Sequence, residues 1–207
     1  MLVLTLSLIA GIAAALLGWV YLLTADPIAA ALQEKTNAAL SEVLPAFDNR
    51  PADETVTRGD VKFYVARKDG QITGFAGETV TPKGYNGDVT VLAGLTPDGA
   101  VTTVLVTQQA ETPGLGTVVT DRKRQKTLSG LIKGACQIGL PPNPVLDQFN
   151  GMKAEVKQTP WAVKKDGGQL DAVTGATITS RAVGGAVFTI AETFANQRET
   201  LMEESNR

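Results

Sequence analysis

Histidine is absent from the 207-residue chain, and Cys136 is its only cysteine. Without histidine, neither a Ser-His-Asp triad nor a Cys-His nucleophile pair can be assembled. A lone cysteine cannot supply a cysteine-rich zinc site, a cysteine-ligated iron–sulfur cluster or a C-x-x-C-H haem attachment. Redox work in this chain would therefore need an organic cofactor or a metal held by carboxylates. Cys136 itself is expected to be a small, partly buried residue.

A strong excess of either charge is also lacking, since the formal net charge is -2 and the sequence pI is about 5.3. This balance gives no global field that would attract polyanions, so nucleic acid is not an expected partner. One basic run, DRKRQK at residues 121–126, could contact anionic lipid headgroups or an acidic partner protein. Such runs are more often the solvated face of a helix.

Charged side chains are missing from residues 1–25, and the run from Leu2 to Leu23 is almost wholly apolar. About 20 apolar residues at helical rise cross the hydrocarbon core of a bilayer. Trp19 and Tyr21 stand where an interfacial aromatic belt would lie. The segment therefore predicts a transmembrane anchor. The alternative, a cleaved signal peptide, would have a basic start, a shorter apolar core and a small-residue cleavage site.

The orientation of this anchor has no support from charge, because no Lys or Arg precedes Trp19 and the positive-inside rule has nothing to count. Almost nothing precedes the span, and the whole folded domain follows it. We therefore expect a single-pass protein of the cytoplasmic (inner) membrane, with a short cytoplasmic end and an extracytoplasmic, periplasmic domain.

The segment after the anchor begins with Asp26-Pro27, a good N-cap followed by proline at the first helical position. Apolar residues then recur at helical spacing as far as Pro45. Polar and turn-forming residues dominate the next stretch, which predicts a linker. The expected organisation is a membrane anchor, a juxtamembrane helix with its linker, and a folded domain, at residues 1–25, 26–60 and 61–207.

Two β-hairpins are predicted around Asp-Gly turns, pairing Val61–Ala66 with Ile72–Val80 and Val89–Leu95 with Val101–Thr107. A long helix is expected from Ser180 to Leu201, with one apolar face made by Val183, Val187, Ile190, Ala191 and Phe194. A shorter helix is expected over Asp121–Gly134. These elements predict an α+β fold, a twisted antiparallel sheet with packed helices.

The segment before the long helix, DAVTGATITS at residues 171–180, has the chemistry of an anion site. It combines four hydroxyl side chains, a glycine that permits close backbone approach, and the unpaired N–H groups of a helix start, which together favour a phosphate. The helix dipole adds a modest attraction. The alternative is that Thr179 or Ser180 simply caps the helix.

The first seven residues of this segment, Asp171 to Thr177, resemble the acceptor motif of FMN-binding domains in Rnf and sodium-translocating NADH:quinone oxidoreductase complexes. In that motif a flavin transferase takes the FMN moiety from FAD and joins its phosphate to the last threonine, here Thr177. The segment ETPGLG at residues 111–116 resembles a loop of the Rnf G subunits and their NqrC relatives. The resemblance extends to GYNGD at residues 84–88 and to the run of the anchor into Asp26-Pro27-Ile28.

The resemblance implies an electron-transfer subunit with covalently bound FMN in a membrane-bound, ion-translocating ferredoxin:NAD oxidoreductase. Such a subunit passes electrons between its partners in the complex, is matured by the flavin transferase, and is not a stand-alone enzyme. Thr177 would carry the FMN, Asp171 would help the transferase, and Leu115 would cover the apolar ring surface. Glu111 and Thr112 would offer polar contacts near the ring, and the residues just before Thr177 would hold the phosphate. The expected cofactor-binding residues are Glu111, Thr112, Leu115, Gly116, Asp171, Thr174, Gly175, Ala176 and Thr177; no catalytic residue or metal ligand is expected.

Other functions stay open for this sequence. The chain could be an NqrC-like subunit of a sodium-translocating NADH:quinone oxidoreductase, or a non-redox anchored module that holds a phosphate-bearing ligand reversibly. It could also act alone as a flavin-dependent reductase or an FMN-binding regulator. One position departs from the family pattern, because many relatives carry histidine two residues before the loop glutamate and this chain has Gln109. No role of that histidine carries over.

Overall fold

The computed structural model describes residues 2–122, 140–155 and 159–205. The chain divides into two compact units, Met1–Ala38 and Ala39–Arg207. Most of the predicted helix over Asp121–Gly134 lies outside the described residues, as do Cys136 and residues 123–126 of the basic run. Asp121 and Arg122, which are described, are not helical.

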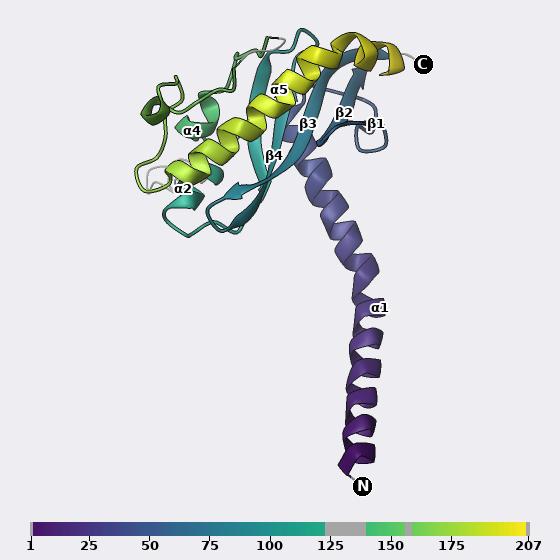
Figure 1. Cartoon of the computed structure of the whole chain (residues 1–207). Helices are drawn as coiled ribbons and strands as arrows, with labels where there is room; N and C mark the ends of the chain where they lie inside the picture. Colours follow the sequence, from purple (N-terminus) through teal and green to yellow (C-terminus); the bar gives the residue numbers. More distant parts are fainter. Residues whose placement is uncertain (1, 123–139, 156–158, 206–207) are drawn as a thin grey trace, which may run out of the picture. The chain divides into compact units, whose positions relative to one another are not determined.

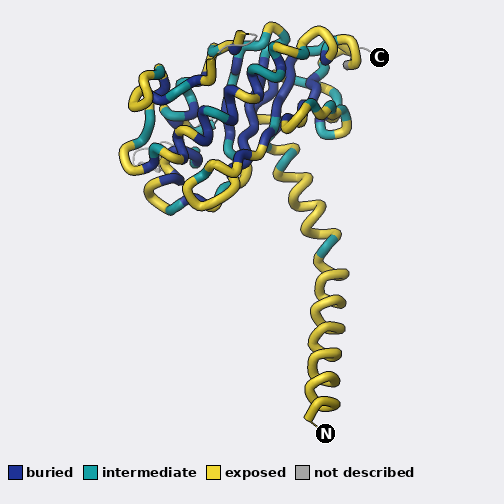
Figure 2. The backbone as a smooth tube through the Cα atoms, viewed as in Figure 1, coloured by how far each residue is buried: buried dark blue, intermediate teal, exposed yellow. Residues whose placement is uncertain are grey.

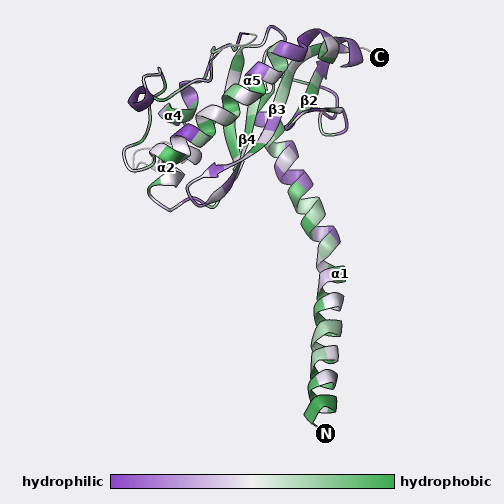
Figure 3. Ribbon diagram, viewed as in Figure 1, coloured by the Kyte–Doolittle hydropathy of each residue, from purple (hydrophilic) through white to green (hydrophobic). Residues whose placement is uncertain are grey.

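Helix α1 (Leu2–Val43) makes up the first unit as far as Ala38, and its last five residues belong to the second unit. Residues 2–38 are exposed almost throughout (Figure 2). Hydrophobic residues dominate the first half of α1 (Figure 3), and by length and composition this helix could cross a membrane. The predicted new helix start at Asp26-Pro27 is wrong, because α1 continues through Pro27. Proline removes one backbone hydrogen bond, but the alanines on both sides strongly favour helix.

The second unit is built on a five-stranded antiparallel sheet in the order β1-β2-β3-β4-β5 (Figure 1). Both predicted hairpins are confirmed, and their Asp-Gly turns contain Gly70 (φ 76°) and Gly99 (φ 86°). The sheet starts earlier than expected, since β1 forms within the predicted linker and pairs with β2. The strands are β1 (Thr55–Arg58), β2 (Val61–Lys68), β3 (Gln71–Gly84), β4 (Gly87–Leu95) and β5 (Val101–Gln108).

Each face of the sheet has its own hydrophobic core, because alternate strand residues point to opposite faces. Helix α5 (Thr177–Ser205) crosses β3 and β4 on one face (Figure 1), where its predicted apolar residues are all buried. The opposite face packs against the end of α1 through Leu40 and Val43. The predicted long helix and the α+β class are thus confirmed, with α5 beginning three residues before Ser180.

Three short elements complete the described part of the second unit, and they lie within the segments between β5 and α5. They are helix α2 (Gly116–Thr120), helix α4 (Pro144–Asp147) and the 3-10 turn η1 (Lys164–Asp166). A parallel bridge between Val163 and Leu170 closes the loop that contains η1. This loop leads directly into the segment at residues 171–176.

Candidate functional site

A cavity of about 450 Å³ lies at the start of α5, within the range of roughly 300–1,000 Å³ that small-molecule pockets occupy. Three segments far apart in the sequence form its wall: the β3–β4 turn, the loop at residues 111–116, and residues 175–179. The loop containing η1 adds one lysine. The lining residues are Tyr85, Glu111, Thr112, Leu115, Gly116, Lys165, Gly175, Ala176, Thr177, Ile178 and Thr179.

The backbone turns sharply into α5 at Gly175, whose φ of 86° lies in the left-handed region that favours glycine. The Ala176 N–H donates to the Val173 carbonyl at 3.0 Å, and the first helical bond runs from the Ser180 N–H to the Ala176 carbonyl at 3.0 Å. Among the described residues, no acceptor pairs with the N–H groups of residues 177–179. They are therefore available to an anion at the positive end of the helix dipole.

Thr177 is the first residue of α5, and its partly exposed side chain lines the cavity. None of the residues that the structure describes forms a hydrogen bond with its hydroxyl. Thr179 and Ser180, by contrast, are nearly fully buried and hydrogen-bonded inside the first turn of α5. The capping interpretation of Thr179 and Ser180 is wrong, because the helix begins before both.

The loop at residues 111–116 is held through the buried carboxylate of Glu111. Its Oε1 accepts from the Tyr85 N–H at 2.8 Å, and its Oε2 accepts from the Thr179 hydroxyl at 2.9 Å. The Gln109 side-chain oxygen accepts from the Glu111 N–H at 2.5 Å, and its amide donates to Asp121 Oδ1 at 3.3 Å. Gln109 therefore helps to hold the loop in its conformation.

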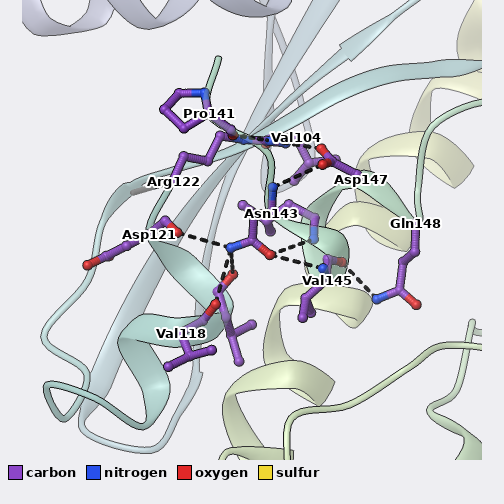
Figure 4. Close-up of polar contacts among 11 residues, drawn as sticks. Val104, Val118, Asp121, Arg122, Pro141, Asn143, Val145, Asp147 and Gln148 are labelled. Carbon is purple, nitrogen blue, oxygen red and sulfur yellow. Dashed lines mark hydrogen bonds and ion pairs between the residues drawn. The ribbon is translucent and has the colours of Figure 1, made fainter. Parts of the chain in front are cut away.

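Helix α2 continues this loop and is fixed at its far end by Asn143 (Figure 4). The Asn143 side-chain amide donates to the carbonyls of Val118 and Val119 at 3.2 and 3.1 Å, while its oxygen caps α4. Beside it, the buried Arg122 guanidinium donates to Asp147 Oδ1 at 2.7 Å and to the Val104 carbonyl at 2.9 Å. These contacts tie the loop and α2 to the sheet.

Seven of the nine predicted cofactor-binding residues line the cavity, and Asp171 and Thr174 do not. Asp171 is exposed and pairs with Lys164 at 2.7 Å, while its backbone N–H donates to Gln148 Oε1 at 2.6 Å. Thr174 is exposed on the turn before Gly175. The sequence prediction misses Lys165 and Ile178, includes Tyr85 only in a resembling segment, and offers Thr179 only as a helix cap. Lys165 lies in the loop that the bridge between Val163 and Leu170 closes. The local sequence pattern does not predict this bridge, so it does not predict that Lys165 lines the cavity.

A second, larger cavity of about 580 Å³ lies between the end of β3, residues 160–166 and the outer side of α5. Ile178 lines both cavities. Arg181 donates two hydrogen bonds to Asp166, both 2.6 Å long. The hydrogen bond from Arg181 holds the pKa of the Asp166 carboxyl below its ordinary value. Among the residues that the structure describes, no group of three or more His, Cys, Asp or Glu could hold a metal ion.

Comparison with known proteins finds a family match in each of the two units. Residues 84–192 match the FMN-binding domain, and residues 3–43 match the RnfG N-terminal region. The G subunit of the ion-translocating oxidoreductase complex of Haemophilus influenzae is 38% identical over 79% of this chain and 74% of its own length. The corresponding G subunit of Vibrio cholerae is 34% identical over 98% of this chain and 93% of its own, and that of Pasteurella multocida is 38% identical over 86% and 84%.

The chain belongs to the RnfG family. The predicted resemblance is thereby confirmed, and the N-terminal match supports the Rnf G interpretation over the NqrC-like alternative. Every residue that lines the 450 Å³ cavity falls inside the matched FMN-binding domain. The matched N-terminal region coincides with α1. Family membership and this apolar helix together indicate a membrane-anchored protein.

Proposed function

We propose that this chain is an electron-transfer subunit of a membrane-bound, ion-translocating ferredoxin:NAD oxidoreductase complex, and that it carries FMN esterified through its phosphate to Thr177. The observation that carries the proposal is the Thr177 hydroxyl, which lines a cavity inside an FMN-binding domain at a helix start and has no hydrogen-bond partner among the residues that the structure describes. The names of the relatives support membership of a complex, so other subunits are the expected electron donors and acceptors.

The residues around the cavity fit both ends of FMN. The N–H groups of residues 177–179, which lack helical acceptors, and the Lys165 side chain suit a phosphate. Tyr85, Leu115 and Ile178 expose apolar surface at the same cavity and suit an isoalloxazine ring. Bound FMN would supply the one-electron chemistry, while the chain supplies position, dielectric and hydrogen bonds.

Attachment to Thr177 requires a flavin transferase, and Asp171, a motif residue outside the cavity, is suited to contact that enzyme. Asp171 and Thr174 are exposed on the turn that precedes the acceptor. Neither lines the cavity, so neither is needed to hold the flavin once it is attached. We assign Asp171 to the encounter with the transferase, and Gly175 and Ala176 to the backbone turn that presents Thr177.

The anchor and the folded domain have different surroundings in this proposal. The apolar part of α1 crosses the membrane once and contacts lipid, and the FMN domain lies on the extracytoplasmic side. A covalent bond suits that side, because a cofactor that dissociated there could not readily be replaced. The anchor keeps the flavin close to the neighbouring carriers of the complex.

Co-expression of the full chain with a flavin transferase tests the proposal. Wild-type protein and Thr174→Ala should show flavin fluorescence in a denaturing gel, and Thr177→Ala should show none. Thr177→Ser should retain some label, because it keeps a hydroxyl. A labelled Thr177→Ala would contradict the assignment of the acceptor. Wild-type protein that binds FMN and releases all of it on denaturation would support the reversible phosphate-ligand module instead.

A further inference from the structure

The Glu111 carboxylate links the three segments that form the cavity wall. It belongs to the loop, and its two oxygens accept from the Tyr85 N–H of the β3–β4 turn and from the Thr179 hydroxyl of α5. Only 5% of Glu111 is exposed, and Thr179 is 1% exposed. Both oxygens of the carboxylate are thus engaged within the protein.

Two glycines make room for this carboxylate. A methyl group on Gly116 would lie 2.4 Å from Glu111 Oε2, and one on Gly84 would lie 2.8 Å from Oε1. Real side chains do not approach so closely, so glycine at both positions lets the carboxylate lie between them. The backbone of the loop is fixed as well, because the Asn86 side-chain amide donates to the Ala110 carbonyl at 2.6 Å.

The first turn of α5 is held by this link as well as by the hydrogen bonds of Ser180. Its earliest helical bond is the one from the Ser180 N–H, so the backbone N–H groups of residues 177–179 do not hold it in place. Helix ends of this kind fray unless other contacts tie them down. Thr179 lies two residues after Thr177, and its hydroxyl ties this turn to Glu111.

We infer that Glu111 is a positioning residue, acting through Thr179 to hold the Thr177 hydroxyl and the anion-binding N–H groups in register with the loop. This replaces the expected direct contact of Glu111 with the flavin ring, and it rests on the proposed attachment of FMN to Thr177. The first turn of α5 is held in place before the flavin arrives. The transferase then meets an acceptor hydroxyl in a fixed position.

Four variants of the full chain in detergent separate this role from a merely structural one. Thr179→Val keeps the shape of the side chain but removes the hydroxyl that bonds Glu111, and Thr179→Ser restores it. Glu111→Gln keeps an acceptor for Tyr85 but places an N–H₂ group at one end. Thr79→Val is the matched control, because Thr79 is equally buried and its hydroxyl donates to the Asp60 carbonyl at 2.9 Å, outside this cavity.

Two measurements are made on each variant in its flavin-free form: the initial rate of flavin attachment by the transferase, and hydrogen exchange in peptides covering residues 84–87 and 176–181. Because misplacing a reacting group by about 1 Å can slow a reaction by about a hundredfold, Thr179→Val and Glu111→Gln should slow attachment by about tenfold or more. Both should also speed exchange in both peptides. Thr179→Ser and Thr79→Val should stay close to wild type in both measurements.

The inference is overturned if Thr179→Val and Glu111→Gln attach flavin as fast as Thr79→Val while the wild type is labelled normally. It is also overturned if exchange at residues 176–181 is unchanged in both. Failure of the wild type to take up flavin at all would instead count against the proposed function, and the exchange result would still decide whether Glu111 holds the first turn of α5.

Discussion

The two cavities that meet at Ile178 differ in chemistry more than in size. The larger, at about 580 Å³, contains Asp166 and Arg181, which already satisfy each other through two hydrogen bonds. The smaller, at about 450 Å³, contains the N–H groups of a helix start and the Thr177 hydroxyl, with which none of the described residues forms a hydrogen bond. Volume alone would favour the larger cavity. The polar groups that have no partner among the described residues favour the smaller cavity as the proposed ligand site.

Adding one methyl group to each cavity should give the largest contrast. Gly116→Ala places its methyl against Glu111 in the smaller cavity, whereas Gly185→Ala in the larger one meets no atom within 4 Å. Overpacking of this kind costs about 1–3 kcal/mol, so Gly116→Ala should lower the free energy of unfolding by that amount. Gly185 lies inside α5, where alanine favours helix by about 1 kcal/mol over glycine, so Gly185→Ala should be neutral or stabilising.

Chemical denaturation of both variants, with the rate of flavin attachment beside it, checks this contrast. Slower attachment in Gly116→Ala alone would sharpen the distinction between the cavities. Equal stability of the two variants would show that Glu111 can move aside, and the close approach of Gly116 to Glu111 would then have no effect on function.

Removing the lysine of the smaller cavity should have an intermediate effect. Lys165 lines the cavity, whereas its neighbour Lys164 pairs with Asp171 outside it. An exposed charge pair is worth about 0.2–1 kcal/mol, so Lys165→Gln should weaken binding of an FMN-like anion to flavin-free protein by about 1.4-fold to fivefold. Lys164→Gln is the matched control and should leave binding unchanged. A titration of both with FMN at two salt concentrations measures this, and equal losses would contradict the assignment of Lys165.

Acid should reveal the pair in the larger cavity, with the smallest effect. Arg181 lowers the pKa of folded Asp166, so in acid the unfolded chain binds more protons, and the stability that the pair contributes is fully present above the unfolded pKa of about 3.9. That contribution is lost as the pH falls through the lower folded pKa. The difference in free energy of unfolding between wild type and Asp166→Asn should therefore shrink on acidification. The rate of flavin attachment should be the same in the two proteins. A difference that grew in acid would contradict this sign.

Local chemistry explains which features the sequence predicted. The two Asp-Gly turns and the apolar face of α5 depend on residues close together in the chain, and both were found. Pro27 and β1 were misjudged because neighbouring alanines and the pairing of Thr55 with Tyr64 outweigh the local turn signals. Tertiary pairing commonly overrides such local preferences.

The site was predictable in composition but not in arrangement. Thr177 and the loop at residues 111–116 are predictable as segments, yet Thr174 and Asp171 do not line the cavity that their neighbours line. Glu111 was expected beside the ring, and only the fold shows that Tyr85 and Thr179 use both of its oxygens. Contacts between segments 26 and 68 residues apart leave no local pattern.

The central claim, that FMN is bonded to Thr177, is tested most directly on protein from the membranes in which it naturally works. Trypsin should release the peptide Asp166–Arg181, which contains Thr174, Thr177 and Thr179. Fragmentation by mass spectrometry should place one FMN phosphoester on Thr177 and none on the other two. Recovery of this peptide only in its unmodified form, or with the flavin on Thr174 or Thr179, would contradict the account.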